Sequence, residues 1–389
     1  MRKRSTGTRM TERTAMRSDR TKRSASGREE EVLPAVGSTW TVGVDLGDRT
    51  SHFCVLDDDG VVVERGRVQT TRDGIGKRFE GQGRMRIALE VGTHSPWVSR
   101  LLKELGHEVL VANPRKTRLI YQNRGKQDPV DAEALARIAR LDPKLLYAVE
   151  HRPESVAQDL AVLRARDALV RTRTLLVNHV RGAVKATGHR LKKCSTRTFP
   201  DQAVDQIPPE VREALSSVLT TIEVVSKRIL ALDGRIRELG KKKYPETALL
   251  RQVGGVGPIV ALAYVLTLEH PGRFQKSRAV GPYLGLVPAR SQSGDSDPQL
   301  RITKEGDAFL RRLLVQSAQY ILGPFGPDCD LRRFGQALSA RGERNAKKRA
   351  VVAVARKLAV LLHRLWRTGE VYEPLRQAGT AHDAAAVAA

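Results

Sequence analysis

The sequence has little cysteine and no long apolar run. Its three cysteines, Cys54, Cys194 and Cys329, lie far apart and form no CxxC pair or Cys/His cluster, which argues against a zinc site and against a disulfide framework. No apolar run approaches the ~20 residues that a membrane-spanning helix needs. The basic N-terminus lacks the apolar segment of a secretory signal. These absences favour a reduced, cytosolic setting without a membrane partner.

Acidic residues are too few to balance the basic ones. The 389 residues include 68 Lys and Arg but only 43 Asp and Glu, which gives a formal net charge of +25. Such an excess indicates a polyanionic partner, most simply nucleic acid. The length is enough for two or three domains with cores of their own.

Both ends of the chain have biased compositions. Residues 1–38 are rich in Arg, Lys, Ser and Thr, so we expect a disordered basic arm. This arm either touches nucleic acid loosely or is a solvated tail, and an alternative start codon further along would shorten it. Residues 377–389 are rich in Ala and are expected to form a disordered tail.

Residues 39–152 alternate between strand and helix patterns. The first three expected strands are close together and read as an antiparallel meander, whereas the last two flank a helix over residues 96–105 and complete a βαβ unit. A further helix starts near Pro129. This order predicts an α/β domain of the RNase H-like type, with the first strand central and the fourth beside it. The expected strands are Thr41–Asp45, His52–Asp57, Val61–Gln69, Met85–Glu90 and Glu108–Ala112.

The rest of the chain has helical patterns. Residues 153–243 carry two long runs with apolar residues at spacings of three and four, which predict an antiparallel coiled-coil hairpin. Two ordinary core helices are the alternative. Residues 244–376 predict an all-α C-terminal domain that begins with a helix, the turn "VGGVGP" and a second helix.

Four acids stand out in the first domain. Asp45 and Glu90 end the expected first and fourth strands, and Asp128 and Asp131 share one face at the start of a helix. Carboxylates gathered in one place repel each other unless cations neutralise them, and hard oxygen ligands suit Mg²⁺ or Mn²⁺. Two such ions can assist phosphodiester chemistry.

Each acid also has a simpler explanation. Asp128 as N-cap, Pro129 in the first turn and Asp131 at the third position make a good helix start without any metal. Asp45 could cap a turn. It could also stand in the first phosphate loop of an actin-like ATPase, but no second acidic phosphate loop is found in the sequence, and the charge of +25 fits that class poorly.

Two further features could contact phosphate. The glycines of "VGGVGP", among them Gly255 and Gly257, precede a helix and could present backbone N–H groups to a phosphate, as helix–hairpin–helix motifs do. A plain turn is the alternative. Lys304, Arg311 and Arg312 could bind nucleic-acid phosphate or form a solvated helix face.

Several long blocks resemble the DEDD transposases of the insertion sequence 110 family. The blocks "GVDLG", "ALEVGTHSPWVSRLLKELGHEVLVANPRK" and "KQDPVDAEALARIA" are similar to its RuvC-like domain. The blocks "VGGVGPIVALAYVLTL" and "RFQKSRAVGPYLGLVPARSQSGDSDPQLRITKEGDAFLRRLLVQSA" are similar to its C-terminal transposase domain. By this match, the D, E, D and D of the family fall on Asp45, Glu90, Asp128 and Asp131.

The resemblance implies a bacterial, nucleoid-associated recombinase that joins donor and target DNA under the guidance of a structured bridge RNA. It implies a homodimer that assembles into a homotetramer, with the acids of one subunit meeting a serine of another. That serine would form a covalent 5′-phosphoserine. Ser293, just before Gly294, is the first candidate, Ser291 the second and Ser296 the third. The sequence departs from the family pattern here, because Gln292 separates serines that are commonly adjacent before the glycine. A DNA invertase or a RuvC-like nuclease of the same architecture is the alternative.

Overall fold

The computed structural model describes residues 40–117, 128–293, 296, 300–342 and 345–376. The chain divides into two compact units, Met1–His151 and Arg152–Ala389. Among the helices of these described residues, none combines the length and the apolar character that a membrane crossing requires.

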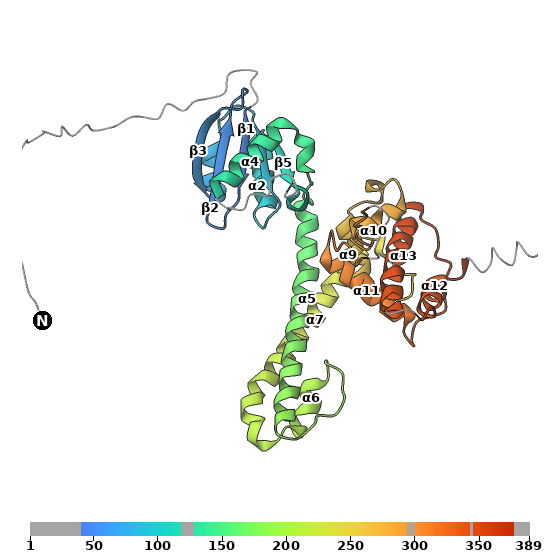
Figure 1. The fold of residues 1–389 in the computed structure, drawn as a ribbon. Coiled ribbons are helices and arrows are strands. Elements are labelled where there is room, and N and C mark those ends of the chain that lie inside the picture. The colour runs from blue at the N-terminus through green and yellow to red at the C-terminus, as the bar shows by residue number, and fades with distance from the viewer. Residues whose placement is uncertain (1–39, 118–127, 294–295, 297–299, 343–344, 377–389) are drawn as a thin grey trace, which may run out of the picture. The chain divides into compact units, whose positions relative to one another are not determined.

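A five-stranded mixed sheet forms the first unit, in the order β3-β2-β1-β4-β5 (Figure 1). β1 pairs antiparallel with β2 and parallel with β4, while β3 and β5 extend the sheet antiparallel to β2 and parallel to β4. The predicted central place of the first strand, beside the fourth, is confirmed, and the order is compatible with an RNase H-like fold. The strands are β1 Thr41–Asp45, β2 Thr50–Leu56, β3 Val62–Gln69, β4 Arg86–Glu90 and β5 Glu108–Ala112.

Helices cover both faces of this sheet. Val42 and Val44 of β1 share a buried cluster with α1 (Arg72–Phe79) and α2 (Ser95–Glu104). The opposite face, which includes Gly43, packs against α4 (Asp128–Leu141). The short elements α3 (Pro114–Thr117) and a 3₁₀ turn (Pro143–Leu146) follow β5 and α4. The sequence analysis did not predict α1, a short helix with two glycines that is held by its buried Ile75 and Phe79.

The α4 helix lies against the backbone of β1. A Cβ atom at Gly43 would lie 1.9 Å from the carbonyl oxygen of Ala132 and 2.5 Å from the amide nitrogen of Ala136, so only glycine permits this approach. The far end of α4 is fixed where Arg140 donates a hydrogen bond to the carbonyl of Asp58. Asp58 follows the end of β2 that pairs with the start of β1. The helix therefore runs antiparallel to β1, and its first turn lies at the Asp45 end.

A long helical hairpin begins the second unit. Its helices, α5 (Glu154–Ala186) and α7 (Pro209–Lys242), pair antiparallel, since Arg166 bonds to Asp233 whereas Arg173 reaches Ser226. The connection folds into α6 (Phe199–Ala203) and a 3₁₀ turn (Val204–Gln206). Phe199 lies in a buried cluster with residues of both long helices.

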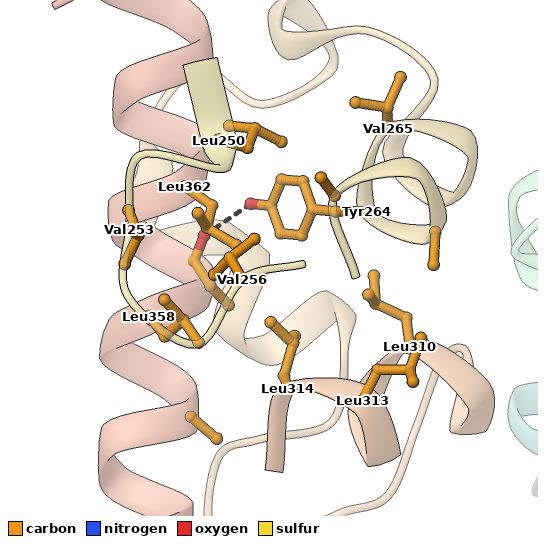
Figure 2. Close-up of a cluster of buried hydrophobic side chains, with 14 of the residues drawn as sticks. Leu250, Val253, Val256, Tyr264, Val265, Leu310, Leu313, Leu314, Leu358 and Leu362 are labelled. Atoms are coloured by element: carbon orange, nitrogen blue, oxygen red, sulfur yellow. Dashed lines mark hydrogen bonds between the residues drawn. The ribbon is translucent and has the colours of Figure 1, made fainter. Parts of the chain in front are cut away.

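The remaining helices of this unit share one core with the base of the hairpin (Figure 2). Tyr264 is fully buried there, and its hydroxyl donates a 2.6 Å hydrogen bond to the carbonyl of Ala359. Leu160 and Leu239 bring α5 and α7 into the same cluster. The helices are α8 Thr247–Leu250, α9 Pro258–Leu268, α10 Val280–Tyr283, α11 Ala308–Leu322, α12 Asp330–Ser339 and α13 Ala346–Thr368, with 3₁₀ turns at Pro271–Arg273 and Ser277–Ala279.

Candidate active site

Two acids end neighbouring parallel strands at the same edge of the sheet. Asp45 is the last residue of β1 and Glu90 the last of β4, directly after the paired residues Val44 and Leu89. Because side chains alternate along a strand, both acids lie on the face that carries Gly43, the face covered by α4. Both are partly buried. Neighbouring strands are about 4.8 Å apart, so Asp45 and Glu90 lie side by side on the sheet and are both only partly exposed to solvent.

The first turn of α4 comes level with these strand ends. Asp128 is one turn before Ala132, which lies over Gly43. Asp131 is one turn before Leu135, which shares a buried cluster with Ala88 of β4. A helical turn advances about 5.4 Å, close to the advance of two strand residues from Gly43 to Asp45. The four predicted acid positions thus occupy one end of the sheet.

The acids are not drawn into a preformed metal cluster. Within the described parts of the chain, no three His, Cys, Asp or Glu side chains stand close enough together to hold an ion. The structure therefore brings the four positions to one end of the sheet, and among the described side chains there Asp45, Glu90 and Asp131 do not meet at a single point.

Ion pairs fasten α4 across the sheet. Glu133 accepts hydrogen bonds from Arg65 of β3, at 2.6 Å, and from Arg137 of α4 itself. Arg65, and after it Arg137, hold the pKa of Glu133 below its usual range. Glu133 follows Asp131 by two residues, so this clamp also fixes the acidic first turn.

The loops beyond the strand ends are also ordered. After β1, a Cβ at Gly47 would lie 2.2 Å from the carbonyl oxygen of Thr50, which makes glycine necessary in this turn. Asp48 of that turn lies 3.7 Å from His94, which follows β4. The amide of Gly92 donates to Ser95 Oγ at 2.9 Å. The segments that follow Asp45 and Glu90 thus come close to each other at Asp48 and His94.

His52 is a site neighbour that the sequence analysis did not single out. It pairs in register with Asp45 on the adjacent strand β2 and lies on the same face of the sheet. Only the strand register reveals this position, because the sequence alone shows no motif around the histidine.

The candidate serines lie on a hairpin-like loop between α10 and α11. Its stem is closed by a bridge between Pro288 and Ile302, and its outer part by mutual backbone hydrogen bonds of 3.1 Å between Ser293 and Ser296. Ser291, Ser293 and Ser296 are all exposed. The loop therefore presents its serines to solvent on an ordered stem.

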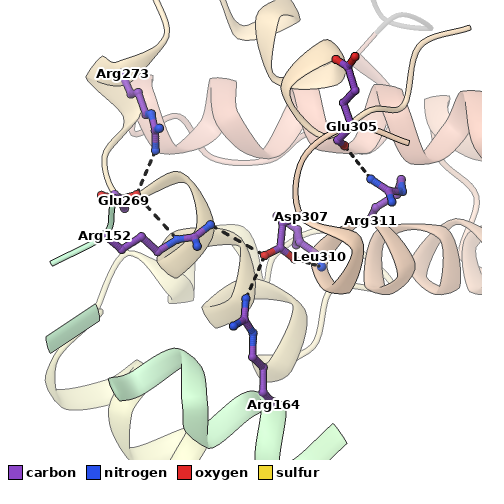
Figure 3. A network of polar contacts seen from close by, with 8 residues as sticks. All are labelled: Arg152, Arg164, Glu269, Arg273, Glu305, Asp307, Leu310 and Arg311. Atoms are coloured by element: carbon purple, nitrogen blue, oxygen red, sulfur yellow. Dashed lines mark hydrogen bonds and ion pairs between the residues drawn. The ribbon is translucent and has the colours of Figure 1, made fainter. Parts of the chain in front are cut away.

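Arg311 and Asp307 hold the two ends of this loop, near Leu284 and Glu305 (Figure 3). Arg311 donates to the carbonyls of Leu284 and Glu305, at 3.0 and 2.7 Å. Asp307 caps α11 through the amide of Leu310, and its carboxylate also meets Arg164 of α5 at 3.4 Å. Arg311 thus joins both ends of the loop to α11, and Asp307 joins its second end to α5.

The predicted phosphate contacts in this region are differently placed. Arg311 braces the loop, and Arg312 donates to Asp167 of α5 at 2.7 Å. Lys304 is exposed, with a positive φ of 57° just before Glu305. Arg311 and Arg312 therefore have structural partners inside the unit.

The glycine turn packs against α11. Gly255 adopts a φ of +86°, and an added Cβ would lie 3.2 Å from the carbonyl oxygen of Ser317. Gly257 is the N-cap of α9 and, being glycine, has no side chain that could cap the amides of the first helical turn. A hollow of about 510 Å³ opens beside the turn and is lined by Arg251 and Tyr320 among others.

Comparison with known proteins places both units. The family model DEDD_Tnp_IS110, described as "Transposase", matches residues 42–188 and includes all four acids. A second model, described as "Transposase IS116/IS110/IS902 family", matches residues 247–328 and includes the glycine turn and the serine loop. The two matches together span more than half of the chain. The first covers the first unit from Val42 onward and continues through α5 of the second unit, and the second lies wholly in the second unit.

Whole-length relatives agree with these matches. The chain is 25% identical to the transposase for insertion sequence element IS1111A of Coxiella burnetii, over 85% of this chain and 90% of that protein. It is 28% identical to a probable family 20 transposase of Pseudomonas aeruginosa, over 86% and 98%. It is 24% identical to the transposase for insertion sequence element IS1328 of Yersinia enterocolitica, over 85% and 98%. The chain belongs to the IS110 family of transposases and is a DNA recombination enzyme.

Proposed function

We propose that this transposase cuts and rejoins DNA through a covalent serine intermediate, with the acids of its first unit as the metal-binding half of the site. The common edge shared by Asp45, Glu90 and the first turn of α4 carries the proposal. Four acids at one end of a sheet are costly unless a cation offsets their repulsion.

The donor set fits a hard divalent cation. Asp45 and Glu90 are partly buried carboxylates on adjacent strands, and Asp128 and Asp131 would complete an oxygen-rich site for Mg²⁺ or Mn²⁺. Such an ion would polarise the scissile phosphate and lower the pKa of an attacking hydroxyl. The chain's own part is to orient the carboxylates through the β1–β4 register and the Gly43–α4 contact.

Ser293 is the proposed nucleophile. Its Oγ attacks the phosphorus, the new Oγ–P bond forms as the P–O3′ bond breaks, and the hydroxyl proton ends on the released 3′ oxygen. No histidine stands in the segment from Leu284 to Asp307, so activation falls to the carboxylate site. Rejoining reverses these steps with the 3′ hydroxyl of the partner strand.

The partners of the reaction are proposed from the family resemblance. Donor and target DNA would be selected by a structured bridge RNA, and the acids of one subunit would meet Ser293 of another in a homodimer that pairs into a homotetramer. The α5–α7 pair is the proposed coiled-coil dimerisation element. The Gly255–Gly257 turn is the proposed helix–hairpin–helix-like phosphate contact, with Lys304 as a further one.

Covalent trapping tests the nucleophile. The full chain is incubated with Mg²⁺, RNA transcribed from the DNA that flanks its gene, and labelled DNA spanning the ends of the element. A denaturing gel then measures protein–DNA adducts. We expect Ser293→Ala to abolish adducts, Ser291→Ala to retain them, and omission of the RNA to prevent them. Adducts at wild-type yield from Ser293→Ala would remove Ser293 from this role.

A further inference from the structure

A large basic cavity lies in the second unit, apart from the acids described above. Its volume is about 1230 Å³, and it is bounded by α12, α13, the stem of the serine loop and residues 372–376. Of the described residues, ten Arg and Lys side chains line it, against two acids, Asp330 and Glu373.

One face of α13 supplies a wall of this cavity. Arg349, Arg356 and Arg364 recur at intervals of seven and eight residues and all line it, while Val354 and Leu358 on the other face are buried in the core. The basic face of α13 therefore borders a cavity to which other elements add further cations, Arg278 and Arg301 among them.

The interior of the cavity is apolar. Leu286, Leu361 and Phe334 line it, and the ammonium of Lys357 lies 4.0 Å from the centroid of the Phe334 ring. A small inorganic anion would leave this apolar lining uncovered. In a double helix the faces of the bases stack on one another. The phosphates of a duplex could therefore pair with the cations of the cavity, but its bases could not contact the apolar side chains that line it.

The charge also limits the occupant. Like charges crowded around a cavity repel each other until a polyanion offsets them. Glu370 pairs with two of the lining arginines, Arg364 at 3.8 Å and Arg376 at 3.0 Å, which leaves an excess of seven positive charges. Residues 377–389 contain a single acid, Asp383, too few to balance this excess. An unpaired nucleic-acid strand combines phosphates at a regular spacing with flat apolar bases, the combination that single-strand binding sites recognise.

We propose that this cavity binds a short unpaired segment of nucleic acid, with its phosphates against Arg356 and its neighbours on α13 and its bases against Phe334. Pro288 and Ile302 line the cavity, and the bridge between them closes the stem of the loop that carries Ser293. An unpaired strand held here would enter beside that loop. The binding itself does not depend on Ser293 being the nucleophile or on the acids holding a metal.

Binding is measured by fluorescence anisotropy with a labelled ten-nucleotide oligo(dT) and EDTA present, so that the proposed metal site plays no part. Lys348→Glu/Arg356→Glu reverses two lining charges. Lys347→Glu/Arg237→Glu makes the same charge change at exposed positions of the unit that do not line the cavity. We expect at least tenfold weaker binding by the first variant and less than threefold by the second. The salt slope should fall by about 1.4 in the first, as for two lost single-strand phosphate contacts.

Phe334→Leu keeps an apolar side chain but removes the flat ring. We expect about tenfold weaker single-strand binding and an unchanged affinity for a duplex of the same length. As a check that needs no variant, an oligonucleotide carrying 5-iododeoxyuridine should cross-link to the peptide that contains Phe334 or Tyr372. Equal losses in the two charge variants, cross-links only elsewhere, or displacement by polyglutamate at the same charge concentration would each overturn the proposal.

Discussion

Single residues decide how closely the elements of the acid-bearing edge approach one another. In the sequence Gly43 is simply part of "GVDLG" and shows no sign of a structural role. In the structure it permits the backbone contact that brings the start of α4 level with Asp45. The sequence predicted the acids as strand ends and a helix start because those positions follow local periodicity. It could not predict the contact between Gly43 and Ala132, which joins segments about ninety residues apart through tertiary packing alone.

Gly43→Ala should therefore disturb both stability and the site. The added methyl group would overlap backbone atoms of α4 that cannot turn aside, and overpacking of this kind costs about 1–3 kcal/mol. Thermal unfolding measures the loss, and metal-dependent adduct formation should fall with it. Gly76→Ala is the matched control in α1, because no atom lies within 4 Å of the added Cβ. This control should hold or raise the melting temperature, and equal melting temperatures for the two variants would contradict the close approach.

A buried histidine makes the first unit sensitive to mild acid. The amide of Met85 donates to His107 Nδ1 at 3.3 Å, so the other ring nitrogen carries the proton and bonds to the carbonyl of Phe79 at 3.0 Å. Burial lowers the pKa of His107 from 6.5, although the bond to Phe79 works the other way. The unfolded chain thus binds a proton below about pH 6.5 that the folded chain does not.

The contribution of His107 to the free energy of unfolding should accordingly be constant above pH 7.5 and fall as the pH drops below about 6.5, by up to about 1.4 kcal/mol per pH unit. Denaturant titrations between pH 7.5 and 5.5 measure this slope. His107→Gln should show a shallower slope over the same range, whatever its absolute stability. An identical slope in the variant would mean that His107 does not carry the effect.

Elements were predicted where one periodicity ran long enough to dominate. The five strands and the two long helices follow such patterns, whereas α1 is only eight residues long and contains two glycines. The hydrogen-bond partners of Arg311 and Arg312 could not be predicted from the sequence either. The helical pattern places both arginines on a polar face, but it does not reveal the carbonyl of Glu305 or the carboxylate of Asp167 that they contact. The coiled coil stays a prediction. The buried positions of α7 recur at spacings of three and four except for one gap of seven between Ile229 and Ile236, and Ser226 occupies one of them.

The middle of the α5–α7 pair holds an arginine whose hydrogen bond to Ser226 Oγ is long, at 3.4 Å. Arg173 is partly buried, its Nε has no hydrogen-bond partner among the described residues, and burial followed by nearby Arg166 lowers its pKa. Replacing such a group by a hydrophobic one is often neutral or stabilising. Arg173→Leu should therefore raise the free energy of unfolding by about 1 kcal/mol. Arg228→Leu, at an exposed position of α7, should stay within about 0.5 kcal/mol of wild type, and a destabilised Arg173→Leu would show that the arginine supports the hairpin.

At the scale of the whole molecule, the two halves of the proposed site lie in separate units, and a mixing experiment asks whether they come from one subunit or two. Asp45→Asn and Ser293→Ala should each be inactive alone. If acids and serine belong to different subunits, a mixed dimer has one site with both defects and one intact site. Random assortment of a two-fold dimer then restores about a quarter of the wild-type adducts.

The readout is adduct yield after the two variants are mixed at equal amounts, under conditions that let subunits exchange, with each variant alone as the control. The adduct must be carried by the Asp45→Asn chain, because only that chain retains its serine, and a size tag on one variant identifies it on the gel. A site built within one subunit would give no recovery, because every subunit would keep its defect. Recovery carried by the tagged Asp45→Asn chain would assign the carboxylates and the nucleophile of each site to different subunits and would make assembly a condition of DNA cleavage.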